Sequence, residues 1–308
     1  MINFRYHLAS LIAVFLALAL GVVVGSTVVD RAIVSGLRDR IDTVESNAER
    51  RKADNDQLRT DLGRVQDSMN SLAPALVAGT LRNVPVAVVA VRGIDAGPVQ
   101  QTVTLLQLAG ARAPGIVWLE GAWELSSRAD VDAFATALDT NDRTTKGLRD
   151  LAAAALVSQS RGVPSGTLNA LVSANAVKYE AVGSEGRGTT IVDWGGTDAR
   201  LLLVDGPAAK VTTRDWNVAV ARAAASVRMP TEVAEVFAKT QDVSDRATRL
   251  QAIHDAADLG GVSTVDDLDL IEGRIAAVLS LADLGRGLPG RYGYGPGATR
   301  SIPERAAS

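Results

Sequence analysis

The chain has 308 residues, of which 47% are hydrophobic, and a formal net charge of −3, enough for one sizeable core or two small ones. Its 32 basic and 35 acidic side chains are interspersed, so it lacks the cationic stripe that nucleic acid requires, and we predict no nucleic-acid partner. Cysteine is absent, which excludes disulfides, thiolate zinc sites and thiol catalysis.

An uncharged segment at residues 8–29 follows a short tail at residues 1–7. At about 1.5 Å per residue, a helix of this length covers the roughly 30 Å hydrocarbon core of a bilayer. The alternative is a cleaved signal peptide, whose apolar region is shorter, about 7–15 residues. We therefore predict an uncleaved, single transmembrane helix in the plasma membrane, in contact with lipid. The tail is predicted to be cytoplasmic and the bulk of the chain extracytoplasmic, because large domains are exported largely regardless of charge.

Small residues recur at every fourth position of this segment. They include Ala13, Ala17, Gly21 and Gly25. Spaced this way, they form a shallow ridge on which a second helix can pack closely, although small residues are also common in membrane helices for reasons of composition. The ridge favours self-association of the span.

A heptad pattern continues through residues 31–73, with apolar residues at alternating spacings of three and four. Its a and d positions include Leu37, Ile41, Val44, Asn55, Leu58, Leu62 and Val65. In a parallel pair the g and e positions bring Arg40 to Glu45 and Asp54 to Arg59, and both pairs attract. The pattern predicts a homodimer through a parallel coiled-coil stalk. A single amphipathic helix packed on its own domain is the alternative.

The next segment, residues 84–285, alternates apolar runs with helical patterns. Strands are predicted at 84–93, 115–121, 177–182, 201–205 and 232–238, and helices at 97–108, 127–138, 145–158, 213–227 and 271–285. Strands separated by helices indicate βαβ units and a mainly parallel sheet. We predict an α/β extracytoplasmic domain with an open, doubly wound, Rossmann-like sheet.

Neither a cofactor nor an enzymatic activity is predicted. The loop "RGIDAGP" has Gly93 and Gly97 but lacks the G-x-G-x-x-G pattern, so Asp95 is interpreted as a helix cap. His254 has no G-x-S-x-G nucleophile motif to serve and is interpreted as a solvated residue on a helix face.

Two segments are candidates for contact with a partner. The acidic stretch "STVDDLDLIEGR" holds Asp266, Asp267 and Asp269 before a helix, where carboxylates favour the positive end of the dipole. A hard-cation or partner site is the alternative there. The glycine-rich tail at 286–308 carries Tyr292 and Tyr294, and its composition favours a flexible segment that orders against a partner. A tail folded against its own domain is the other possibility.

The whole pattern resembles the actinobacterial copper transporter MctB family. The resemblance rests on "AVFLALALGVVVGS", the charged heptad helix, the α/β domain, "STVDDLDLIEGRIAAVLSLADL" and "GRYGYGPGA". It implies copper export through an outer-membrane channel. The family also includes the SteB envelope proteins, which implies a SteA-type membrane protein as partner and a role in the cell envelope or in cell division.

The residues themselves favour the second implication. Copper(I) sites use clustered Cys, Met or His, whereas here Met69, Met229 and His254 are scattered along the chain. A channel also needs a closed wall, which one helix per chain supplies only in a higher oligomer. We therefore expect an anchored, dimeric interaction or assembly module, with copper efflux through an oligomeric channel as the alternative.

Overall fold

A computed structural model describes residues 4–164, 166–212, 215–238 and 242–304, with the side chains of 26–36, 38, 39 and 243 left out. The chain divides into two compact units, Met1–Val65 and Gln66–Ser308, and each is described by itself. The second unit is called the head below.

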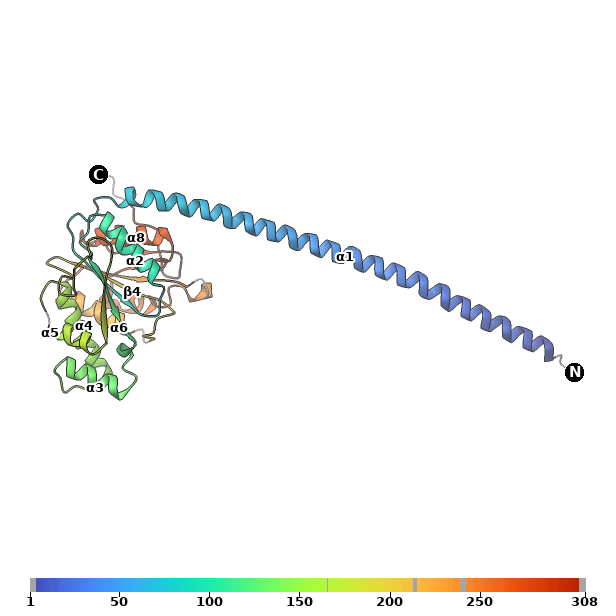
Figure 1. The fold of residues 1–308 in the computed structure, drawn as a ribbon, viewed down its shortest axis with the longest axis horizontal. Helices are drawn as coiled ribbons and strands as arrows, with labels where there is room; N and C mark the ends of the chain where they lie inside the picture. Colours follow the sequence, from blue (N-terminus) through green and yellow to red (C-terminus); the bar gives the residue numbers. More distant parts are fainter. Residues whose placement is uncertain (1–3, 165, 213–214, 239–241, 305–308) are drawn as a thin grey trace. The chain divides into compact units, whose positions relative to one another are not determined.

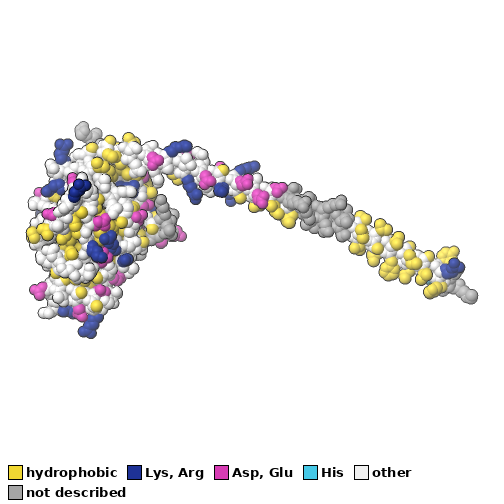
Figure 2. Space-filling model, viewed as in Figure 1, with side chains coloured by type: hydrophobic (Ala, Val, Ile, Leu, Met, Phe, Trp, Pro, Cys, Tyr) yellow, Lys and Arg dark blue, Asp and Glu magenta, His cyan; other side chains and the backbone are white. Residues whose placement is uncertain are grey.

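A single continuous helix, α1 (Phe4–Val77), forms the described part of the first unit and enters the second (Figure 1). Its segment Phe4–Gly25 is long and apolar enough to cross a membrane. Figure 2 shows hydrophobic side chains gathered on this segment and charged ones farther along the helix. The predicted span at 8–29 overlaps it, and the side chains of 26–29 lie outside the described residues.

Helix α1 does not end at residue 73, as the heptads and Pro74 predict. It continues through Pro74 to Val77. A proline inside a helix removes one backbone hydrogen bond and is unfavourable by itself. Here Ala73 and Val77 on either side of it are fully buried in the head, as is Leu81 beyond the helix. Burial of these apolar side chains offsets the lost bond, so the chain leaves the helix one turn later than predicted.

The head is built on a seven-stranded sheet in the order β3-β2-β1-β4-β5-β6-β7. The strands are β1 (Val86–Val91), β2 (Gly115–Leu119), β3 (Val177–Ala181), β4 (Arg200–Asp205), β5 (Thr231–Glu235), β6 (Ser263–Val265) and β7 (Arg291–Tyr292). Only the β2–β3 pair is antiparallel among the described pairings. This arrangement confirms the predicted α/β class with a mainly parallel sheet.

Helices cover both faces of the sheet (Figure 1). Helices α2 (Ala96–Leu108) and α8 (Ile271–Leu284) pack together on one face, and α4 (Thr145–Ser160) and α6 (Asp215–Ser226) pack together on the other. Shorter elements complete the head: η1 (Gly121–Glu124), α3 (Arg128–Ala137), α5 (Gly166–Ser173), η2 (Val243–Asp245), α7 (Gln251–Asp255) and η3 (Ala257–Leu259). Because both faces are covered, every residue of β1 is buried, which explains its unbroken run of apolar residues.

The starts of α2, α3 and α4 follow capping rules. Asp95 accepts a hydrogen bond from the backbone N–H of Gly97 at 2.9 Å, which confirms it as the cap of α2. Ser127 and Thr144 cap α3 and α4 in the same way. The sequence patterns miss α5, β6 and β7, which are too short for a periodicity to emerge. The two strands also depend on neighbouring strands for their hydrogen bonds.

The central strand β4 should dominate the stability of the head. Leu202 is fully buried, so Leu202→Ala should lower the free energy of unfolding by about 2–5 kcal/mol. Leu108→Ala is the matched control, because Leu108 is 51% exposed, and should change it by less than about 0.5 kcal/mol. Equal losses in denaturant titrations of the two variants would contradict the assigned core.

Candidate functional site

The predicted dimerisation residues lie on one long helix with their side chains exposed. Large apolar side chains at the heptad positions are between 48% and 66% exposed; they are Leu37, Ile41, Val44, Leu58, Leu62 and Val65. Asn55 is exposed among them. Exposed apolar side chains along one face of a helix are typical of a surface that contacts another chain. The structure confirms the helix, whereas the dimer stays a prediction.

The ridge of small residues in the apolar segment is also open. Ala13, Ala17, Gly21 and Gly25 are exposed on α1. A methyl group built at Gly21 or Gly25 would meet no atom of the described chain within 4 Å. Close packing of a second helix on this ridge stays a prediction.

In the head, the place where doubly wound folds bind ligands lies between the carboxyl ends of β1 and β4. Two described loops, one after each strand, meet at this place. The backbone N–H of Lys210 donates to the carbonyl of Arg92 at 2.7 Å. Gly93 adopts a φ of 107°, and a methyl group there would lie 2.5 Å from the carbonyl oxygen of Ala208. The two loops are therefore in contact.

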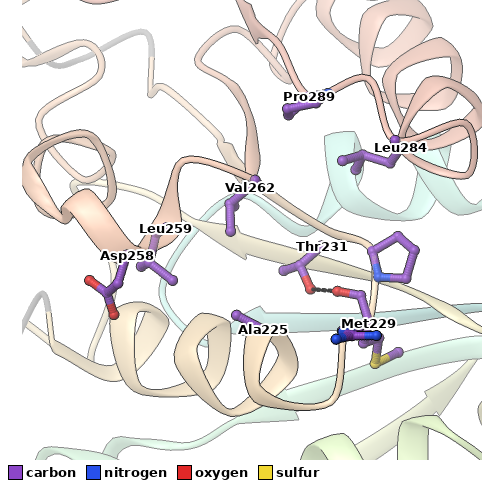
Figure 3. A pocket seen from close by; sticks show the side chains of 12 residues that line it. Ala225, Met229, Thr231, Asp258, Leu259, Val262, Leu284 and Pro289 are labelled. Carbon is purple, nitrogen blue, oxygen red and sulfur yellow. Dashed lines mark hydrogen bonds between the residues drawn. The ribbon is translucent and has the colours of Figure 1, made fainter.

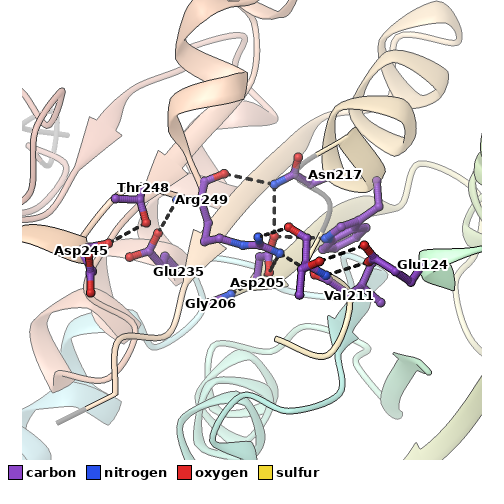
Figure 4. Close-up of polar contacts among 11 residues, drawn as sticks. Glu124, Asp205, Gly206, Val211, Asn217, Glu235, Asp245, Thr248 and Arg249 are labelled. Carbon is purple, nitrogen blue, oxygen red and sulfur yellow. Dashed lines mark hydrogen bonds and ion pairs between the residues drawn. The ribbon is translucent and has the colours of Figure 1, made fainter. Parts of the chain in front are cut away.

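Asp205, the last residue of β4, is at the centre of the polar network at this edge (Figure 4). Its carboxylate forms an ion pair with Arg249 at 3.0 Å and accepts hydrogen bonds from Gly206 and Trp216 at 2.8 and 3.0 Å. Burial raises the pKa of Asp205, and the guanidinium of Arg249 opposes this shift. Arg249 also donates to the carbonyl of Val211 at 2.7 Å, so one buried arginine joins β4 to the loop that follows it.

Glu235, the last residue of β5, holds the segment that carries Arg249. Its carboxylate accepts from the backbone N–H groups of Ala247 and Arg249 at 2.8 and 3.0 Å. Burial raises the pKa of Glu235 to about 7, although these two hydrogen bonds act to lower it. The network therefore orders loops of the head and leaves no exposed carboxylate at these two strand ends.

The acidic stretch is not an exposed contact surface, which corrects the prediction for Asp266 and Asp267. Both are fully or almost fully buried. Asp266 accepts from the backbone N–H groups of Tyr294 and Gly295, both at 2.9 Å. Asp269 pairs with Arg246 at 3.2 Å. None of the three carboxylates caps α8 through a side-chain hydrogen bond. Asp266 and Asp269 bond to neighbouring segments instead.

Asp267 is different, because neither of its carboxylate oxygens has a hydrogen-bond partner in the described structure. Burial is the largest cause of a pKa raised from 3.8 to about 7, and the nearby charge of Asp266 adds to it. Such a group is most stable when it carries its proton.

The glycine-rich tail contributes strand β7 to the sheet, and Arg300 forms a further bridge to Tyr292, which corrects the prediction of a flexible segment for this part of the tail. Its strand β7 pairs with β6 through Tyr292 and Val265. Tyr292 is buried, so it is not a contact residue, whereas Tyr294 is 61% exposed. Residues 305–308 lie outside the described part. His254 is half-buried and bonded to Thr264 at 3.0 Å, so it is not a solvated residue either.

The described residues contain no group of three or more His, Cys, Asp or Glu side chains that could hold a metal ion. The residues that order the carboxyl edge, Arg246, Arg249 and Glu235, were missed in the sequence. One signal was present: "LLLVD" and "TEVAE" each end a buried strand with an acid, which predicts a buried partner at the strand end. The partner arginines lie outside any regular pattern.

Asp267→Asn should flatten the pH dependence of stability. In the unfolded chain this group loses its proton near pH 4, and in the folded head near pH 7. The free energy of unfolding is therefore highest at acidic pH, where Asp267 is protonated in both states. It falls by at most roughly 4 kcal/mol as the pH rises to about 7. Denaturant titrations between about pH 5 and pH 8 should show a shallower decline for the variant.

The exposed Glu185→Gln is the matched control and should keep the wild-type decline. Glu235 contributes in the same pH range, so some decline should remain in Asp267→Asn. An unchanged slope for Asp267→Asn would contradict the assignment of a buried, unpartnered acid.

The matches to known proteins extend over nearly the whole chain. The family model described as "Copper transport outer membrane protein, MctB" matches residues 1–303. The protein named copper transporter MctB in Mycobacterium bovis is 28% identical over 322 residues, covering 97% of this chain and 98% of that relative. Its namesake in Mycobacterium leprae is 28% identical over 328 residues, covering 99% and 100%. The chain belongs to the MctB family.

Proposed function

We propose that this protein is a membrane-anchored, dimeric interaction module of the cell envelope. The observation that carries the proposal is the row of exposed apolar side chains on α1. In a single chain these side chains remain in water, and pairing two helices removes them from it at a gain of about 25 cal/mol per Å² of apolar surface. In this proposal α1 is the anchor and stalk, and the head provides the contact surface for a second membrane protein of the SteA type.

The topology belongs to the same proposal. The apolar segment Phe4–Gly25 anchors the chain in the plasma membrane with its N-terminus in the cytoplasm. Two chains anchored in one membrane emerge in the same direction, so their helices pair in parallel. The head then acts outside the membrane, in envelope assembly or division control, as the resemblance to SteB implies.

Cysteine crosslinking tests the dimer, and the natural chain has no cysteine to interfere. Leu58→Cys and Leu62→Cys place thiols at d and a positions, where the two helices of a parallel pair face each other. Both variants should form a disulfide-linked dimer in native membranes under mild oxidation. The measurement is the dimer fraction on a non-reducing gel.

Thr60→Cys is the matched control, because Thr60 lies on the same exposed stretch of α1 but on the outer face of the heptad. It should stay monomeric. Equal crosslinking at all three positions, or at none, would rule out the predicted register.

The second candidate function is copper transport, favoured by the family match and by the names of the mycobacterial relatives. In this alternative the protein contributes to copper homeostasis or efflux through an oligomeric channel, in an outer membrane as the family description has it. A channel wall would require several α1 helices around a lumen, since each chain supplies one candidate span among its described residues.

Conductance and copper content separate the two functions. If the protein is an interaction module, the purified full chain should give no channel currents in planar bilayers. A deletion strain should then hold the same copper as its parent, as measured by elemental analysis. Channel currents together with copper accumulation that the wild-type gene reverses would instead support transport.

A further inference from the structure

Two adjoining cavities open at the amino edge of the sheet, opposite the edge that the arginine network occupies. One, of about 360 Å³, lies among α6, η3 and the end of α8 (Figure 3). The other, of about 440 Å³, lies beside the first residue of β4. Both are lined by Arg228, Met229 and Pro230, so they share one wall. Cavities of these sizes are in the range that holds small ligands.

The larger cavity is cationic. Arg161, Arg200 and Arg228 line it together with one acid, Asp198. Within the part of the chain that the structure describes, no carboxylate forms an ion pair with any of the three arginines. Burial lowers the pKa of the half-buried Arg200, whose guanidinium donates to the carbonyl of Leu281. A bound anion would supply the missing countercharge.

The smaller cavity is lined mainly by apolar side chains. Ala225, Leu259, Val262, Leu284 and Pro289 point toward one hollow from three segments of the head (Figure 3). Apolar residues are exposed beside both cavities: Val227, which lines the cationic one, is 39% exposed, and Leu288 is 54% exposed. A hydrocarbon chain would remove this surface from water.

Arg228 stands at the junction in an unfavourable backbone conformation. It follows α6 with a φ of 56°, in the left-handed region. The N–H of Met229 bonds to the carbonyl of Ala224 at 2.9 Å, and that of Arg228 bonds to Ala225 at 3.0 Å. This is a Schellman helix end, in which the left-handed position is usually glycine. The chain places a cationic side chain there instead, against the preference of the backbone.

From these features we infer that the amino edge binds a single-chain amphiphile with an anionic headgroup, either phosphate or carboxylate. The headgroup binds Arg161, Arg200 and Arg228, and the hydrocarbon chain lies between α6, η3 and α8. Charge complementarity fixes the position of the ligand's headgroup, and the adjoining apolar cavity fixes the position of its hydrocarbon chain. This inference concerns the head alone and does not depend on the proposed dimer.

Photolabelling of the full chain in phosphatidylcholine nanodiscs tests the site. The probe is dodecyl phosphate with a diazirine in its chain, and labelled residues are mapped by mass spectrometry. Label should appear within residues 225–231, 259–262 and 284–289. Unlabelled dodecyl phosphate should compete, whereas dodecanol and inorganic phosphate should not, because each lacks one of the two recognised parts.

Two variants separate the two halves of the site. Arg228→Gly removes a cation and gives the helix end its preferred residue, so labelling should fall about tenfold or more while the unfolding midpoint does not decrease. Ala225→Trp fills the apolar cavity from an exposed position and should reduce labelling equally. Arg161→Gln removes a second cation of the cavity, at the end of α4, and should also reduce labelling.

Matched controls are Arg128→Gln and Ala133→Trp, both at exposed positions on α3, and they should label like the wild type. Labelling that survives in Arg228→Gly and Ala225→Trp would overturn the inference. Equal competition by dodecanol would also overturn it, because the headgroup would then contribute nothing. Label confined to residues 4–25 would show binding to the bilayer segment instead.

Discussion

Burial of the central strands on both faces is the constraint on which the rest of the head depends. Strands β1 and β4 lie between α2 and α8 on one side and α4 and α6 on the other, and their side chains are almost all buried. A charged side chain inside these layers would be left without water, at a cost of several kcal/mol. In β1 and β4 the charged residues are therefore Arg200 and Asp205, the first and last residues of β4, and the chain surrounds them differently at the two edges of the sheet.

At the carboxyl edge the chain satisfies its own charges. Asp205 and Glu235 end neighbouring strands, and Arg249 links their surroundings through its side chain and its backbone. Removing one member of such a buried pair typically costs about 3–5 kcal/mol, because the other is left uncompensated. At the edge where this fold usually binds ligands, ion pairs and hydrogen bonds thus hold the loops of the head in place. At the amino edge three arginines lack a carboxylate partner among the described residues, and cavities remain open there.

In the first unit the unsatisfied surface is apolar, because α1 leaves a row of large apolar side chains exposed. An isolated helix gains most of its stability from packing such a face against something else. In the apolar segment lipid can do this, and small residues allow a second helix to approach. Beyond it, only another protein surface can. The relatives of this chain carry the name copper transporter MctB. The anchored dimer that we propose would cover the exposed apolar row on α1.

The sequence by itself determined the features that depend on local pattern: the apolar segment, the long heptad helix, the capped helices and the buried parallel strands. Hydrophobic period and capping are properties of residues close together in the chain, so they can be read without the fold. Tertiary structure alone decided the role of polar residues whose partners are distant. Asp266 and Asp267 look like a solvated cap in the sequence but are buried, because the terminal segment folds back to pair as β7. Likewise Arg161, Arg200 and Arg228 follow no common motif, and only the fold places them around one cavity, where α4 and α6 end and β4 begins.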